Sequence, residues 1–125
     1  MLLPPLSAFR GFEVVVVDGY AIRALVDIDF VAGGNPARYA YVPLNELWLE
    51  GGGVPEDMAA DLLHEWVECR DMLDHGTTYD VAHDRACDVE RKFRTAMWNG
   101  EVEIPSAADI CGAVGDWLTQ HGMAA

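Results

Sequence analysis

The fold is decided by the stretch PEDMAADLLHEWVECRDMLDHG, residues 55–76. Its apolar residues, among them Met58, Leu62 and Trp66, recur every three to four positions, which is the period of one face of an α-helix. Proline suits the first turn of a helix, and glycine suits the position just past its end. The sequence therefore predicts a helix over about residues 55–75.

Two further helices are predicted towards the C-terminus. Thr78 can cap a helix over about residues 78–98, and Ser106 can cap another over about residues 106–121. Gly76 leaves only a short connection between the first two helices. We expect those two helices to form an antiparallel pair.

Towards the N-terminus the residues suit strands. Residues 12–17 and 21–30 are rich in β-branched residues and flank an Asp-Gly turn dipeptide, which predicts a hairpin. Residues 38–42 and 46–49 are two shorter strand candidates. Strands first and helices second predict an α+β fold, with a small antiparallel sheet in the N-terminal half covered on one face by about three helices from the C-terminal half.

Length and composition are those of one globular domain, residues 1–125. Half of the residues are hydrophobic, at 51%, which argues against disorder. The longest apolar run, residues 14–17, is far too short to span a bilayer, and the N-terminus lacks the features of a signal peptide. Three cysteines at wide spacings indicate no disulfide framework. We expect a protein of the reducing bacterial cytoplasm, with no membrane contact.

The charge is strongly negative, at −13. Residues 44–90 hold 13 acidic residues against two arginines, Arg70 and Arg85. Such a field repels nucleic acid, membranes and acidic substrates, and it attracts cations and basic protein surfaces. Direct nucleic-acid binding is therefore not expected.

The residues most suited to chemistry form the pattern H-E-x-x-E within HEWVE, residues 64–68. Residues four apart lie on one side of a helix, so His64 and Glu68 can reach the same ion. Glu65 can then address a bound water, by the logic of the H-E-x-x-H motif. On the next helix His83 or Glu90 can lie opposite. Two histidines and a carboxylate suffice to bind zinc.

Cys87 follows His83 by one helical turn and could also bind a metal. A small buried thiol is the interpretation that the sequence favours for it.

Several segments together resemble a known family. They are YVPLNELWL (residues 41–49), LLHEWVE (62–68), Gly76, YDVAH (79–83) and Glu90. This pattern is similar to that of small proteins from phages and bacterial mobile elements, described as zincin-like metallopeptidases. The similarity runs from about Arg38 to Glu90.

The resemblance implies a zinc site, with zinc as the cofactor of a minimal or degenerate metallohydrolase. His64, Glu68 and His83 would be its ligands, and Glu65 or Glu90 would be the acid/base group or a group supporting the ligands. Tyr79 would be a further supporting group. The chain has Glu68 where a zincin has its second histidine, so the resemblance implies a metal site more strongly than it implies proteolysis.

Helical periodicity also favours other interpretations of the same residues. His64 and Glu68 fall opposite the apolar stripe, on the side of Asp57 and Asp61, which is typical of a solvated acidic face. Alternatively, the polar residues form a structural cluster between the helices. The sequence leaves the metal site, the structural cluster and the solvated face open.

A solvated face would make the protein an interaction partner. It would bind the basic surface of a nucleic-acid-binding complex by imitating DNA, as an anti-CRISPR-like inhibitor of a host defence effector would. The oligomeric state is not determined by the sequence. The residues of this face would be Asp57, Asp61, Glu68, Asp71, Asp74, Asp80, Asp84 and Asp88.

Overall fold

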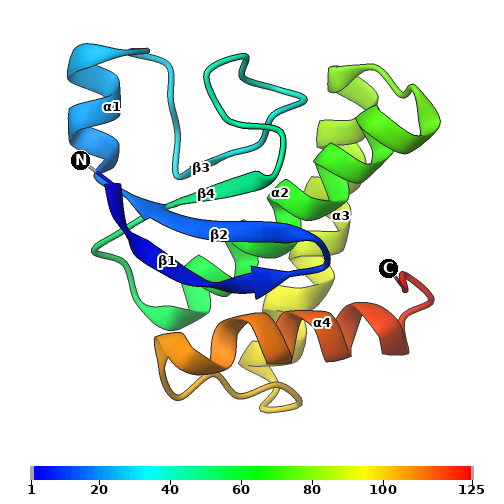
Figure 1. Cartoon of the computed structure of the whole chain (residues 1–125). Helices are drawn as coiled ribbons and strands as arrows, with labels where there is room; N and C mark the ends of the chain where they lie inside the picture. The colour runs from blue at the N-terminus through cyan, green and yellow to red at the C-terminus, as the bar shows by residue number, and fades with distance from the viewer. Residues whose placement is uncertain (1, 125) are drawn as a thin grey trace.

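The computed structural model describes the backbone of residues 2–124 and the side chains of residues 8–124. It has the predicted α+β fold, with a sheet built from the N-terminal half and three helices from the C-terminal half (Figure 1). The elements are β1 (Leu2–Phe9), β2 (Phe12–Val17), α1 (Gly19–Leu25), β3 (Gly33–Gly34), β4 (Glu46–Glu50), α2 (Pro55–His75), α3 (Tyr79–Trp98), the 3-10 turn η1 (Ala107–Asp109) and α4 (Ile110–Gln120).

The four strands form one sheet in the order β1-β2-β4-β3. β1 and β2 are antiparallel, β2 and β4 are parallel, and β3 and β4 are antiparallel. The sheet is therefore mixed, whereas the sequence suggested an antiparallel one. The parallel pair arises because the chain crosses over between β2 and β4, through α1 and the long loop that follows it.

The predicted hairpin around Asp18 and Gly19 is wrong. Asp18 instead accepts a hydrogen bond from the Ala21 N–H (3.2 Å) and caps α1. An aspartate serves a helix N-terminus as readily as a turn, so the dipeptide is ambiguous. The real hairpin joins β1 to β2 through Arg10 (φ 49°) and Gly11 (φ 89°), and positive φ at both positions is the geometry of a tight hairpin turn.

The strand predicted at residues 38–42 is also wrong. The Asn35 carbonyl accepts hydrogen bonds from the Arg38 N–H (3.2 Å) and the Tyr39 N–H (3.0 Å), so the chain turns there. β4, in contrast, begins where the sequence placed a strand, at Glu46.

Both faces of the sheet are covered. Val14 and Val16 of β2 pack in the larger core, against α2 and α4. Val15 and Val17 point the other way, into a smaller core with Phe30. The run of four buried valines is the pattern of a strand buried on both faces. α2 and α4 cover one face, and α1 with its following loop covers the other.

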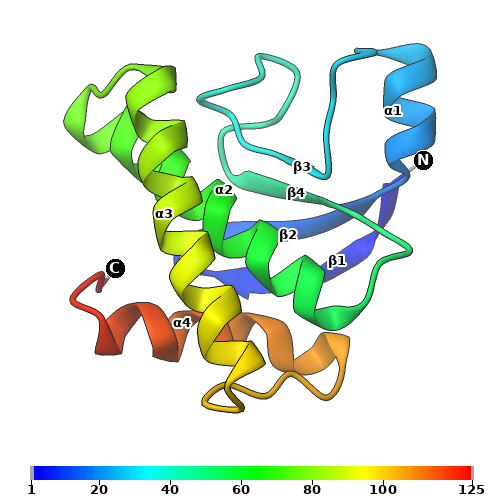
Figure 2. The same ribbon diagram turned by 180° about the vertical axis from the view of Figure 1, so that it is seen from behind.

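α2 lies between the sheet and α3 (Figure 2). Because α3 covers the side that periodicity assigned to solvent, the expectation of a solvated face at His64 and Glu68 is wrong. These residues are only 8% and 2% exposed. The predicted end of α2 at Gly76 is confirmed, with left-handed φ of 65°. Within residues 2–124, none of the helices has the length and apolar character needed to cross a bilayer.

Candidate metal centre

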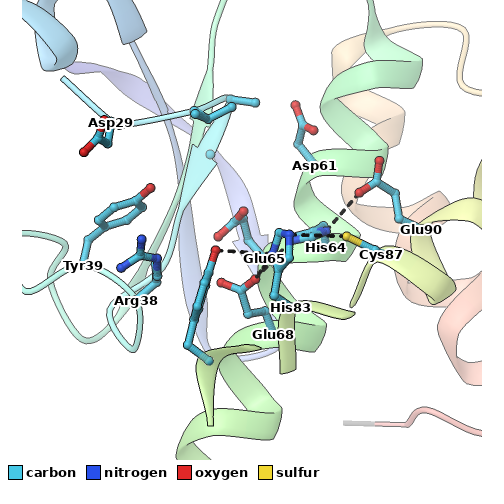
Figure 3. Close-up of a pocket in the computed structure, with 14 residues that line it drawn as sticks. Asp29, Arg38, Tyr39, Asp61, His64, Glu65, Glu68, His83, Cys87 and Glu90 are labelled. Atoms are coloured by element: carbon cyan, nitrogen blue, oxygen red, sulfur yellow. Dashed lines mark hydrogen bonds and ion pairs between the residues drawn. The ribbon is translucent and has the colours of Figure 1, made fainter. Parts of the chain in front are cut away.

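Polar side chains from α2 and α3 meet at a cavity of about 390 Å³. The third wall is the segment before β4, which contributes Asp29 and Arg38 among others. Figure 3 shows side chains of α2 and α3 converging on one another across the cavity. The short turn at Gly76 makes the helices antiparallel, and this brings residues far apart in sequence together, as the sequence predicted.

Glu68 is the centre of this cluster. Its Oε2 lies 3.1 Å from His64 Nε2 and 3.0 Å from His83 Nδ1. Its Oε1 accepts a hydrogen bond from Asn35 Nδ2 (3.1 Å). Burial alone would raise the pKa of Glu68, but the hydrogen bonds to His64 and His83 outweigh it and hold the pKa below its ordinary value. Glu68 is therefore an ionised carboxylate facing two imidazoles.

His64 lies between two carboxylates, because its Nδ1 is 3.0 Å from Glu90 Oε1. Burial would lower the pKa of His64, but hydrogen bonds to Glu68 and Glu90 outweigh it and raise the pKa to about 10. Glu90 also accepts a hydrogen bond from Arg94 Nε (2.8 Å), and Arg94 pairs in turn with Asp57 (2.8 Å). Without a metal, an imidazolium at His64 thus balances the carboxylates around it.

Glu65 is also buried, at 8% exposure. Its Oε1 accepts a hydrogen bond from Asn35 Nδ2 (2.9 Å). Burial, reinforced by the charge of Glu68, raises the pKa of Glu65 to about 8. Gly33 makes room for it, since a Cβ at that position would lie 3.1 Å from Glu65 Cγ and 3.0 Å from a β4 carbonyl oxygen. The fold thus keeps a carboxyl group that holds its proton near neutral pH.

The third potential metal ligand is Cys87. Its Sγ lies 3.5 Å from His83 Nε2, and the side chain is half-buried at the cavity. One donor atom each from His64, His83 and Cys87 lies within 4.8 Å of the others. The interpretation of Cys87 as a core thiol is therefore wrong. Tyr79 stacks on His83, with its hydroxyl 3.4 Å from Nδ1, where a supporting group was expected.

The spacing of these atoms is compatible with a bound metal ion. In a tetrahedral zinc site, bonds of roughly 2.0–2.3 Å place nitrogen and oxygen ligands roughly 3.3 Å apart, and nitrogen and sulfur roughly 3.6 Å apart. Glu68 Oε2 lies 3.1 and 3.0 Å from the two imidazoles, and Cys87 Sγ lies 3.5 Å from His83 Nε2. His83 faces Glu68 with Nδ1 and Cys87 with Nε2. The orientation of the His83 ring would therefore decide whether Glu68 or Cys87 shares a metal ion with it.

The eight acidic residues of the predicted docking face do not form one surface. Glu68 and Asp71 are buried, and Asp61 lines the cavity, where burial and the charge of Glu90 raise its pKa to about 7. Asp57 and Asp88 are exposed but paired with arginines. Asp74, Asp80 and Asp84 are exposed.

Sequence reasoning missed Asn35, which is fully buried and donates to both Glu65 and Glu68. The sequence around it, Gly-Gly-Asn-Pro, signals only a turn. Its Oδ1 does make that turn, by accepting from the Ala37 and Arg38 N–H groups (both 3.0 Å). No local signal says that its amide reaches a helix about thirty residues away.

Replacing Asn35 by alanine is expected to lower the free energy of unfolding by about 2–3 kcal/mol, since the buried Glu68 carboxylate and the buried Glu65 carboxyl group lose a donor. Urea unfolding of the metal-free protein measures this. Asn45→Ala, at an exposed position, is the control and should change stability by less than about 0.5 kcal/mol. Equal stability of the two variants would contradict the role assigned to Asn35.

Comparison of the chain with protein-family models, curated proteins and solved structures gives no match. The resemblance to zincin-like proteins therefore stays a prediction. What is shown for this chain is a His-His-Cys group with the spacing of a metal site, on an α+β fold.

Proposed function

We propose that this protein binds one zinc ion through His64, His83 and Cys87, with the carboxylate of Glu68 beside them. The observation that supports this most directly is the convergence of two imidazoles and a thiol within 4.8 Å. The three residues come from two helices that pack together, so α2 and α3 would hold the ligands rigidly. Rigid elements position metal ligands better than loops do.

The donor set favours zinc over the hard cations. Magnesium and calcium prefer sites made wholly of oxygen ligands, whereas imidazole and thiolate together are typical zinc ligands. Glu90 also supports the proposal, because its carboxylate lies 3.0 Å from His64 Nδ1 and leaves His64 Nε2 directed at Glu68. A carboxylate that orients a ligating histidine in this way is a common feature of zinc sites.

The chemistry we propose is hydrolysis by a minimal metallohydrolase. Bound zinc would supply Lewis acidity and lower the pKa of a water molecule that it holds. Glu65 is the group of this chain suited to exchange a proton there, because its pKa is raised to about 8 and it lines the same cavity. Asn35 holds the Glu65 carboxyl group in place through the 2.9 Å hydrogen bond.

The competing explanation is a polar cluster that only stabilises the contact between the helices. It would account for the hydrogen bonds of Glu68, but it gives no role to the Cys87 thiol beside His83. The interaction function, in which exposed acidic residues bind a basic partner, is a weaker proposal because Glu68 and Asp71 are buried. Metal content separates these possibilities.

We expect purified, tag-free protein to contain about one zinc per chain by elemental analysis. His64→Ala, His83→Ala and Cys87→Ser should each lose it, while His75→Ala, at an exposed position of α2, should keep it. Zinc at a hundred times its dissociation constant should raise the free energy of unfolding by about 2.7 kcal/mol. In cobalt-loaded protein, a thiolate-to-cobalt absorption band that disappears in Cys87→Ser would identify sulfur as a ligand. Zinc-free wild type that also fails to take up added zinc would refute the site.

A further inference from the structure

The cavity contains one arginine among its lining residues, and no lysine. Arg38 lies at the wall opposite α2, across the cavity from His64 and Glu65 (Figure 3). Its side chain is exposed, so it meets solvent and any incoming ligand. Five carboxyl side chains line the same cavity, namely Asp29, Asp61, Glu65, Glu68 and Glu90. Arg38 is thus the one arginine among the residues that line an acidic cavity.

Two tyrosine rings hold the Arg38 guanidinium. Its Cζ lies 4.2 Å from the centre of the Tyr79 ring and 5.0 Å from that of Tyr39. Stacking on aromatic faces restrains the plane of a guanidinium and reduces the entropy lost when it binds a ligand. Tyr79 also stacks on His83. One ring therefore connects Arg38 to a proposed zinc ligand.

Among the described side chains, Arg38 has no carboxylate within ion-pair distance, which is also true of Arg10 and Arg70. Among the described side chains, the arginines that form ion pairs are Arg23, Arg85, Arg91 and Arg94. Arg38 forms none of these pairs, despite the number of acidic residues nearby. The fold directs a planar cation towards the cavity and leaves it without an ion-pair partner, although the charge of Glu68 attracts it.

We propose that Arg38 is the substrate-binding residue of this site and takes an oxyanion, a carboxylate or phosphate group of the substrate. The inference rests on the proposed zinc site and adds its substrate class. A guanidinium binds such a group through two parallel hydrogen bonds. The rest of the cavity is acidic and repels anions. Arg38 therefore selects substrates whose anionic group lies at its guanidinium while the substrate bond next to that group faces the metal.

The test is a titration of wild type, Arg38→Gln and Arg38→Lys with sodium acetate and, separately, with inorganic phosphate. Each is followed by the ¹H–¹⁵N signals of the protein, including the Arg38 Nε–H. Arg91→Gln is the matched control, because Arg91 is exposed on α3 and its loss changes the net charge equally. The titrations are made on zinc-loaded and on metal-free protein, and the zinc content of every sample is measured.

We expect at least one of the two anions to bind about tenfold or more weakly to Arg38→Gln, and Arg91→Gln to match wild type. Arg38→Lys should recover only part of the affinity, because lysine keeps the charge and loses the planar pair of donors. The anion that binds more tightly identifies the group as carboxylate or phosphate. Equal affinity of Arg38→Gln and wild type, or no binding of either anion to wild type, would overturn the proposal.

The outcome is separable from that of the zinc site. Arg38 is not a ligand, so Arg38→Gln should hold as much zinc as wild type. Absence of zinc from every sample would refute the proposed metal function alone. The metal-free titration would still support or overturn the assignment of Arg38.

Discussion

Replacing Glu68 by alanine is expected to lower the free energy of unfolding of the metal-free protein by about 3–5 kcal/mol. The residue is 2% exposed and faces His64, His83 and Asn35 at 3.0–3.1 Å. Its removal leaves a buried imidazolium and a buried amide without their partner, and that desolvation cost dominates. Urea unfolding in the presence of a chelator measures the change.

The pH dependence of this difference provides a further check. Because the pKa of Glu68 is held below its ordinary value of 4.5, the folded state loses its proton more readily than the unfolded state. The stability from Glu68 is therefore present above about pH 4.5 and is lost as the pH falls through the lower, folded pKa. The difference in the free energy of unfolding between wild type and Glu68→Ala should therefore become smaller at acidic pH. Asp74→Ala, exposed on α2, is the control, and an equally small effect at both positions would contradict the central role of Glu68.

Glu65→Gln should have the opposite effect on stability. The pKa of Glu65 is raised from 4.5 to about 8, so between these values the folded state binds more protons than the unfolded state. Wild-type stability then falls as the pH rises from about 4.5 to about 8 and levels off above that. Glutamine cannot ionise and can still accept the hydrogen bond from Asn35. In metal-free protein the variant should gain on the order of a few kcal/mol over wild type at pH 9, and none at pH 4.

Thermal unfolding between pH 4 and pH 9 measures this, with Glu56→Gln, exposed on the same helix, as the control. The stability of the variant should still fall in part as the pH rises, because the pKa of Asp61 is also raised, to about 7. Stability curves of wild type and Glu65→Gln that run parallel would show that Glu65 titrates normally. The same variant should keep its zinc and lose any hydrolytic activity, since Glu65 is proposed to move the proton and not to bind the metal.

The helices were predictable because their signals are local. Apolar residues at a spacing of three to four, with Pro55 at the start of α2 and Gly76 after its end, determine where α2 begins and ends. The short turn at Gly76 favours an antiparallel partner helix, and the packing of α3 on α2 then brings Glu90 beside His64 and His83 beside Glu68.

The strands were harder, because strand pairing is not local. Asp18 and Gly19 have the chemistry of a hairpin turn and also that of a helix start, and the choice depends on whether β2 already has two partners. It has β1 on one side and β4 on the other. The residues after Gly19 therefore have no edge of β2 left to pair with and form α1 instead.

The sequence by itself determined the α+β class and the bounds of the long helices, and it indicated that His64, Glu68, His83 and Glu90 could meet between α2 and α3. Only the tertiary structure decided that these residues are buried, that Cys87 belongs with them, and that Asn35 and Arg38 complete the cavity. The physical reason is that helical periodicity distinguishes the polar and apolar sides of a helix but does not indicate how many sides other elements will bury. α2 packs against both the sheet and α3, so its polar side became an interior, where carboxylates and imidazoles must find partners and change their pKa values.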